Sequence, residues 1–180
     1  MYLNPYRIFQ KIEPILRSFY RRISEPSIPN LKGDRDIEYS WIAANMPEGP
    51  GEALDFGSGP SCMGLIAVRK RFNVKAVDIE PIKWFYKHSH FKFIQGDIFK
   101  LEFSPAYFDL IINFSTIEHV GLAGRYRTTE SRPDGDIEAM KILKTILKPN
   151  GTMLLTIPVG RDKVFTPCIV FMVKNVCQSF

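Results

Sequence analysis

From residue 51 onward, the chain alternates between short apolar runs and segments in which apolar residues recur every three or four positions. The apolar runs predict five β-strands, at Glu52–Phe56, Val74–Asp78, Phe91–Gln95, Phe108–Asn113 and Thr152–Ile157. The segments with helical spacing predict helices at Ser61–Arg71, Pro81–His88 and Asp136–Leu147. Strands that alternate with helices predict βαβ units, and hence an α/β fold with a doubly wound, mostly parallel sheet.

The first part of the chain has a different pattern. Its apolar residues recur with the spacing of an amphipathic helix; they are Ile8, Ile12, Ile15, Leu16, Phe19 and Ile23. Pro14 lies inside this pattern and would bend the helix or divide it. A linker follows at Glu25–Asn30, and a second helix is expected from about Asp34 to Asn45. We therefore predict an N-terminal extension and linker at 1–30, a core at 31–160 and an atypical tail at 161–180.

Length and composition indicate one globular domain. The 180 residues are 45% hydrophobic and 24% charged, which provides enough apolar surface for a core. The net charge of +5 is scattered apart from a cluster at Arg17, Arg21 and Arg22, so a nucleic-acid partner is disfavoured. No apolar stretch approaches the ~20 residues of a membrane span, and the N-terminus lacks the apolar segment of a signal peptide.

Cysteines and histidines form neither a disulfide pattern nor a metal-binding pattern. The chain has 3 cysteines and no CxxC pair, which favours a reducing and therefore cytoplasmic location. His88 and His90 are two residues apart, and no third ligand follows at a usual spacing. We therefore expect no metal. The oligomeric state stays open.

A glycine-containing turn follows the first predicted strand, at Asp55-Phe-Gly-Ser-Gly59. Glycines at 57 and 59 permit a tight turn and let a ligand approach the backbone, with the next helix N-terminus adding partial positive charge. A glycine-rich turn of any βα unit would look the same. A dinucleotide-binding loop needs G-x-G-x-x-G, but Cys62 occupies the third glycine position and Pro60 follows the second glycine. This disfavours NAD and FAD.

Acids follow the next two predicted strands, where ligands of parallel sheets bind. Asp78 ends the second strand, and a carboxylate there can accept both hydroxyls of a ribose, or it can cap a helix. Asp97 follows the third strand in Gly96-Asp-Ile98, where an acid can accept from an adenine amino group while Ile98 packs on the ring. Gly-Asp is also a common turn, so the combination is more specific than either acid alone.

Together these motifs resemble the class I S-adenosylmethionine-dependent methyltransferases. The matching segments are Leu54–Gly59, Ala76–Ile79, Gln95–Ile98, Phe108–Ile112 and Leu147–Leu155. The resemblance spans about residues 36–160 and implies a seven-strand, Rossmann-like sheet that binds S-adenosylmethionine. By this resemblance, the homocysteine part lies along the 55–59 loop, the ribose on the second strand and the adenine after the third. The implied cofactor-binding residues are Asp55, Gly57, Ser58, Gly59, Asp78, Ile79, Asp97, Ile98 and Ser115.

The segment after the fourth strand is the candidate acceptor side. Residues 115–122, 124–126 and 133–136 resemble a smaller, mostly uncharacterised subgroup, some of whose members lie near sugar-modification genes, which implies a small-molecule or sugar acceptor. Glu118 and His119 are candidate bases for an acceptor that must lose a proton. Alternatively, Glu118 caps a helix and His119 bonds in the pocket wall. Arg125 and Tyr126 either hold the acceptor or are loop residues facing solvent.

The tail departs from the family pattern. The resemblance implies two further strands in an antiparallel hairpin, but residues 167–180 show no turn and no second strand pair, so we expect an open sheet edge in a C-terminally truncated chain. Codons read one base earlier from the Pro167 codon permit Leu-His-Arg-Val-Tyr-Gly-Lys-Glu-Arg-Leu-Pro, which resembles related proteins. We therefore hypothesise a frameshift near Pro167. Methyl transfer is the main functional hypothesis. The alternatives are an inactive remnant that at most binds a ligand, and a nucleotide-dependent oxidoreductase.

Overall fold

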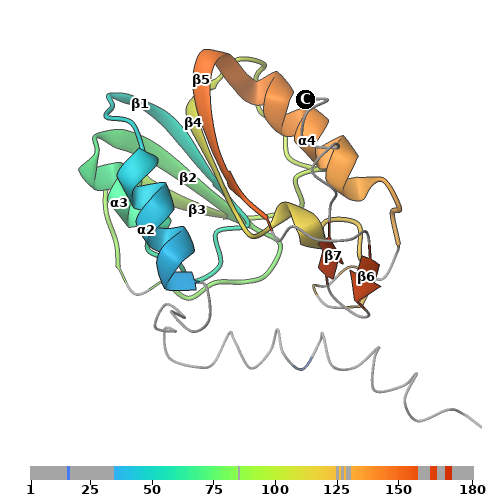
Figure 1. The fold of residues 1–180 in the computed structure, drawn as a ribbon. Coiled ribbons are helices and arrows are strands. Elements are labelled where there is room, and N and C mark those ends of the chain that lie inside the picture. Colours follow the sequence, from blue (N-terminus) through green and yellow to red (C-terminus); the bar gives the residue numbers. More distant parts are fainter. Residues whose placement is uncertain are drawn as a thin grey trace, which may run out of the picture.

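A parallel sheet forms the centre of the computed structural model (Figure 1). Its strands run in the order β3 (Phe91–Gln95), β2 (Phe72–Asp78), β1 (Gly51–Phe56), β4 (Phe108–Phe114) and β5 (Leu147–Thr156). All four neighbouring pairs are parallel. The chain moves outward from β1 to β3 and then returns to place β4 on the other side of β1. The strand order therefore reverses between β1 and β4, where doubly wound sheets bind ligands.

The structure describes residues 35–157 apart from five positions, together with Leu16 and the segments 163–165 and 169–171. The five exceptions are Phe85, Arg125, Arg127, Thr129 and Glu130. The predicted N-terminal helix lies outside the described residues except for Leu16, which is helical and exposed. Within the described part of the chain, none of the helices combines the length and the apolar character that a membrane span requires.

Helices cover both faces of the sheet (Figure 1). Helices α2 (Arg35–Asn45) and α3 (Met63–Arg69) lie on one face, and α4 (Gly135–Ile146) lies on the other. Each face has its own apolar core, to which the central strands contribute alternate residues. On β4, Leu110 and Ile112 face the α2–α3 side, whereas Ile111 packs with Leu143 of α4. This two-sided burial explains the nearly continuous apolar run of this strand.

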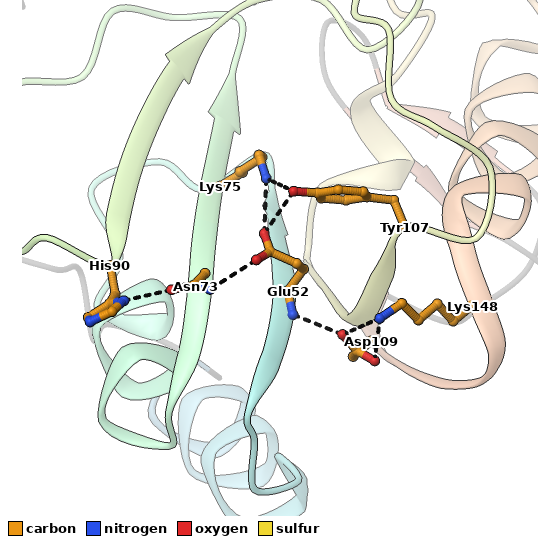
Figure 2. Close-up of polar contacts among 7 residues, drawn as sticks. All are labelled: Glu52, Asn73, Lys75, His90, Tyr107, Asp109 and Lys148. Carbon is orange, nitrogen blue, oxygen red and sulfur yellow. Dashed lines mark hydrogen bonds and ion pairs between the residues drawn. The ribbon is translucent and has the colours of Figure 1, made fainter.

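A polar network occupies the edge of the sheet at which the parallel strands begin (Figure 2). The Glu52 carboxylate on β1 accepts hydrogen bonds from the Lys75 ammonium at 3.0 Å and the Tyr107 hydroxyl at 3.0 Å. Asp109 on β4 accepts the Glu52 backbone N–H at 2.9 Å, and its carboxylate pairs with the Lys148 ammonium at 2.8 Å. These contacts join β1 to both of its neighbours, and β4 to β5. They lie where the strands begin, whereas the sequence motifs lie where the strands end.

Most predicted elements are confirmed with small shifts of their ends. The strand at Phe91–Gln95 has the predicted bounds, and the helix expected from about Asp34 begins at Arg35. The last predicted strand starts earlier than expected, at Leu147, and includes the Pro149–Gly151 turn signal. Its register against β4 shifts after Phe108, which accommodates the extra residues as a bulge.

The predicted helix at Pro81–His88 is wrong, because the described residues of this segment form no regular element. Trp84 and Tyr86 both contact Phe91, with ring centroids 4.7 and 4.9 Å apart, respectively. Residues two positions apart point to nearly opposite sides of a helix, so a helical segment could not bring both rings to Phe91. Aromatic packing therefore overrides the helical spacing here.

The expectation that the main sheet lacks its last two strands is confirmed for the described residues, although a short strand pair that was not expected forms near the tail. Strands β6 (Lys163–Phe165) and β7 (Ile169–Phe171) pair antiparallel in a separate two-stranded sheet. They do not extend the main sheet, so among the described residues β5 remains its last strand. In Figure 1 the pair lies near the end of β4, where β7 approaches the short helix that follows.

Candidate functional site

The glycine loop after β1 is tied to the end of β2. The backbone N–H groups of Gly57 and Ser58 donate to the Val77 carbonyl oxygen at 2.8 and 3.1 Å. The Gly59 N–H donates to Asp78 Oδ2 at 2.8 Å. Three amides that the sequence assigned to a ligand therefore have partners within the fold. These hydrogen bonds hold the loop in one conformation.

Glycine occupies positions 57 and 59 of the loop for different physical reasons. At Gly57, with φ of 64°, a Cβ atom would overlap the Thr116 side chain, so no larger residue fits. At Gly59, with φ of 47°, no heavy atom lies within 4 Å of the position that a Cβ would occupy. Gly57 is therefore needed for packing against the segment after β4, whereas Gly59 presents its backbone to free space that a ligand can enter.

Asp78 and Asp97 lie at neighbouring strand ends, as predicted. The Gly96 backbone N–H donates to the Asp78 carbonyl oxygen at 2.9 Å, which places the Gly96-Asp97 turn beside the end of β2. Asp78 Oδ1 accepts the Glu80 N–H at 2.8 Å, and Asp97 Oδ1 accepts the Phe99 N–H at 3.1 Å. Each carboxylate thus also shapes its own turn. Their roles toward a ribose and an adenine stay predictions.

The two isoleucines assigned to the cofactor differ in their surroundings. Ile98 is 4% exposed and belongs to the core on the α4 side, together with Val77 and Ile117. Ile79 is half-buried, and its carbonyl oxygen accepts from Gln95 Nε2 at 3.3 Å. Ile98 therefore has little surface to offer an adenine in this conformation, while Ile79 remains partly accessible.

Asp55 is a buried acid at the end of β1. Only 1% of its surface is exposed, and among the described residues Oδ2 has no hydrogen-bond partner. Burial raises its pKa to about 7, the Gly64 backbone N–H lowers it, and the negative charge of Asp78 raises it further. A carboxyl group with this pKa is largely neutral in weakly acidic solution and ionises readily when a positive charge comes close.

The charge of the same buried acid influences two tyrosines. Burial raises the pKa of Tyr39 to about 12, and the nearby Cys62 and Asp55 add to this effect. Burial likewise raises the pKa of Tyr86, again with contributions from Asp55 and Cys62. Tyr39 comes from α2, so this helix contributes to the surroundings of the loop. This contribution could not be predicted from the sequence, because Tyr39 precedes the first recognisable motif.

Buried polar atoms without hydrogen-bond partners occur in the loop and on the neighbouring strand β4. Among the described residues, these are Asp55 Oδ2, Ser58 Oγ and Asn113 Oδ1, whose side chains are at most 3% exposed. Asn113 lies on the opposite face of the sheet, where its amide is 3.8 Å from Met140 Sδ. Buried polar atoms in proteins usually have partners, so such atoms beside free space are candidates for ligand contacts. Asp55 and Ser58 therefore fit the predicted cofactor.

Ser115 follows β4 with a left-handed backbone, at φ of 43°. Its N–H is shared between the Thr156 carbonyl oxygen and hydroxyl, at 3.0 and 3.1 Å. Its hydroxyl donates to Glu38 Oε1 of α2 at 2.7 Å. Ser115 was predicted to contact the cofactor, but in this structure its hydroxyl proton is directed to a helix outside the motifs. Glu38 was missed because it is 77 residues away and belongs to no motif.

The candidate catalytic residues lie in the 3-10 helix η1 (Ile117–His119). The Glu118 and His119 side chains are 4% and 13% exposed, and Nε2 of the histidine is 3.9 Å from Oε1 of the acid. The His119 ring is 5.5 Å from the Tyr126 ring. The structure therefore brings three of the four predicted acceptor-side residues together. Arg125 lies outside the described residues. No group of three possible metal ligands occurs in the described part of the chain.

Two glycines close the loop that carries Tyr126. A Cβ at Gly121, with φ of 87°, would overlap the Arg132 carbonyl oxygen, and a Cβ at Gly135 would contact the Gly121 backbone. The Arg132 N–H donates to the Gly121 carbonyl oxygen at 2.9 Å. Gly121 and Gly135 are thus explained by close approach of one backbone to another. Roles of Glu118, His119 and Tyr126 in chemistry stay predictions.

Comparison with known families supplies an identification. Residues 71–171, more than half of the 180 residues, match the family described as "Caenorhabditis protein of unknown function, DUF268". The chain belongs to this family. The matched region of this DUF268 protein begins just before β2, so it includes Asp78, Asp97 and η1 but not the 55–59 loop or α2. Among curated proteins, none matches the chain.

Solved structures show the fold. One similar structure is a 1,6-didemethyltoxoflavin-N1-methyltransferase from Burkholderia thailandensis with bound S-adenosylhomocysteine, at TM-score 0.62 and 14% identity over 99% of this chain and 78% of that one. A phosphoethanolamine N-methyltransferase from Haemonchus contortus has TM-score 0.59 and 16% identity over 94% and 41% of the two chains. The [4+2]-cyclase SpnF has TM-score 0.55 and 13% identity over 96% and 69%. The DUF268 chain therefore has the Rossmann-like methyltransferase fold.

Proposed function

We propose that this DUF268 protein transfers a methyl group from S-adenosylmethionine to a small-molecule acceptor. The observation that carries the proposal is the free space over Gly59 in a loop that also holds the buried Asp55 carboxyl and Ser58 hydroxyl, each with an atom that lacks a partner among the described residues. This place is the strand-order reversal between β1 and β4. The methyltransferases of similar fold from Burkholderia and Haemonchus have S-adenosylhomocysteine bound, which supports the choice of cofactor.

The cofactor would lie across the ends of β1, β2 and β3. Its homocysteine part would occupy the loop at Asp55, Ser58 and Gly59, its ribose would contact Asp78 and Ile79, and its adenine would lie near Asp97 and Ile98. S-adenosylmethionine supplies a methyl group that is already activated on a sulfonium. The protein then contributes mainly alignment and exclusion of water. A buried carboxyl at Asp55 suits a ligand with positive charge, because that charge favours its ionised form.

The acceptor would lie near η1. Glu118 and His119 are candidates to remove a proton from the acceptor, and Tyr126 packs beside the histidine. Arg125, the neighbour of Tyr126 in sequence, is the candidate for holding an anionic or sugar-like group. Residues 115–122, 124–126 and 133–136 resemble a subgroup of which some members lie near sugar-modification genes, and this supports a sugar-type acceptor. A cytoplasmic location, favoured by the cysteine pattern, stays a prediction.

A second candidate is a binding module without catalytic activity. The fold alone does not decide between them, since the similar SpnF structure is named as a [4+2]-cyclase rather than a methyltransferase. The internal use of the Gly57, Ser58 and Gly59 amides also favours this candidate, because these groups are not free to bind a ligand carboxylate. This candidate predicts no turnover with any acceptor.

Titration calorimetry with S-adenosylmethionine tests the proposal, with NADH as the comparison ligand. We expect heat of binding for the first ligand and none for the second. Gly59→Asn should abolish binding, because asparagine tolerates a left-handed backbone and its side chain would fill the free space. Gly124→Asn is the matched control, since Gly124 also has a positive φ, of 100°, and open space at its Cβ position. Equal loss of binding in both variants, or no binding by the parent chain, would rule out the proposed site.

A further inference from the structure

Helix α2 packs against the end of β4 through one side of its first turns. The Arg35 guanidinium lies 4.9 Å from the centre of the Phe114 ring, and the Tyr39 ring is 4.7 Å from the same ring. Glu38 lies between them in sequence and accepts the Ser115 hydroxyl proton. Residues 35, 38 and 39 are three and four positions apart and therefore share one helix face. This face is the part of α2 that meets the strand ends.

The contact between Glu38 and Ser115 holds a residue in an unfavourable conformation. Ser115 has φ of 43°, a region that serine seldom adopts unless surrounding contacts stabilise it. The backbone N–H of Ser115 donates to Thr156. The hydroxyl of Ser115 donates to Glu38, which is its only side-chain partner among the described residues. A hydrogen bond to a carboxylate is stronger than one between neutral groups. Glu38 therefore helps to fix the backbone at this position.

The next residue transmits this position to the glycine loop. The Thr116 hydroxyl shares its proton between the Phe114 carbonyl oxygen at 3.0 Å and the Gly57 carbonyl oxygen at 3.2 Å. The Thr116 side chain also occupies the space that a Cβ of Gly57 would need. Displacement of Ser115 would move Thr116 and so release one side of the loop. The other side stays attached to β2 through Val77 and Asp78. The loop is thus held between β2 and a segment that depends on α2.

We propose that Glu38 is a positioning residue for the methyl donor: by holding Ser115, it keeps Thr116 against Gly57 and the loop open at Gly59. This inference rests on the proposed function. It assigns a role in cofactor affinity to α2, which lies before all the loop and strand-end motifs and outside the region matched to the DUF268 family. Glu38 acts through Ser115 and Thr116 and need not touch the donor.

The test is S-adenosylmethionine affinity in four variants, measured by calorimetry at a temperature at which each is folded. Glu38→Ala and Ser115→Ala should each weaken binding roughly tenfold, and the double variant should be no weaker than either single one, because both remove the same contact. Glu38→Gln keeps an oxygen that can accept the Ser115 proton, so it should bind within about twofold of the parent chain. Near-normal affinity in Glu38→Gln would show that binding depends on the hydrogen bond to Ser115 and not on the negative charge of Glu38.

Asp36→Ala is the matched control. It removes an acid from the same helical turn, but Asp36 is exposed and its carboxylate accepts only the Ile37 N–H among the described contacts. It should leave the affinity unchanged. Additive losses from Glu38→Ala and Ser115→Ala, or equal losses from Asp36→Ala and Glu38→Ala, would overturn the inference while the proposed function stands. Absence of binding by the parent chain would overturn both.

Discussion

Asp78 Oδ2 accepts the backbone N–H of Gly59 at 2.8 Å, so the acid assigned to the cofactor ribose is also the residue that holds the glycine loop. Its other oxygen accepts the Glu80 N–H at 2.8 Å. One side chain therefore links the end of β2 to the end of β1 and starts the turn that follows. The structural role of Asp78 is thus observed, its binding role is proposed, and mutation has to separate the two.

Asp78→Asn should separate these roles better than Asp78→Ala. Asparagine keeps one carbonyl oxygen, so it can accept one of the two backbone protons but cannot offer two acceptors to a ribose. We expect Asp78→Ala to lower the free energy of unfolding by about 1–3 kcal/mol, and Asp78→Asn by less, while both weaken S-adenosylmethionine binding. Urea unfolding and calorimetry measure the two effects. Unchanged affinity in Asp78→Ala would remove this residue from the binding site.

Asp55 should make the stability of the empty protein depend on pH. Its pKa is about 7 in the folded chain against an ordinary value of 3.8, so between these pH values the folded protein holds a proton that the unfolded chain releases. The contribution to stability is complete below about pH 4 and is lost as the pH rises through about 7. A tenfold difference in proton affinity corresponds to about 1.4 kcal/mol, so the total loss is on the order of 4 kcal/mol.

Asp55→Asn should therefore remove most of this loss, and the variant should be more stable than the parent chain at pH 8 but not at pH 4. Urea unfolding at both pH values measures this. Asp109→Asn is the control of opposite sign: partial burial raises the pKa of Asp109, but the Lys148 hydrogen bond, the Glu52 N–H and the Lys148 charge lower it more in total. Parallel pH profiles for Asp55→Asn and the parent chain would contradict the prediction.

Glu118 should affect turnover more than cofactor binding. Its side chain is 4% exposed in η1, with His119 Nε2 at 3.9 Å, on the acceptor side of the predicted donor site. Glu118→Gln keeps the size of the side chain but removes its basicity. If the acceptor must lose a proton, we expect a 10²–10⁴-fold slower release of S-adenosylhomocysteine with unchanged donor affinity. Equal turnover in the variant, with any acceptor that the parent chain methylates, would exclude Glu118 as the base.

The sequence was sufficient for the sheet because burial on both faces leaves a strong local signal. Nearly continuous apolar runs such as Phe108–Asn113 indicate central strands that are buried on both faces. The helix at Pro81–His88 failed because its outcome depends on Phe91, which lies outside the segment and offers its ring to Trp84 and Tyr86. The spacing of residues within a segment carries no information about a contact with a later strand.

The same distinction applies to the site. The acids at strand ends could be predicted, since a parallel sheet brings the ends of its strands to one edge. Glu38 could not, because it is linked to the site by a hydrogen bond to Ser115, which lies 77 residues later. The internal use of the loop amides was equally hidden, since it depends on how the loop meets the end of β2. Motifs thus indicate which residues meet, and packing decides which of their atoms remain for a ligand.

The polar network around Glu52, which lies where the strands of the sheet begin, should contribute to stability without affecting cofactor binding. Partial burial raises the pKa of Glu52, but hydrogen bonds from Asn73, Lys75 and Tyr107 lower it more in total. The carboxylate therefore adds stability above its ordinary pKa of 4.5, and this is lost as the pH falls through the lowered value. Tyr107→Phe removes one donor to Glu52 and should lower the free energy of unfolding by about 1 kcal/mol. Because the two edges of the sheet are remote, S-adenosylmethionine affinity should stay unchanged, and a drop in affinity would mean that the edges are coupled.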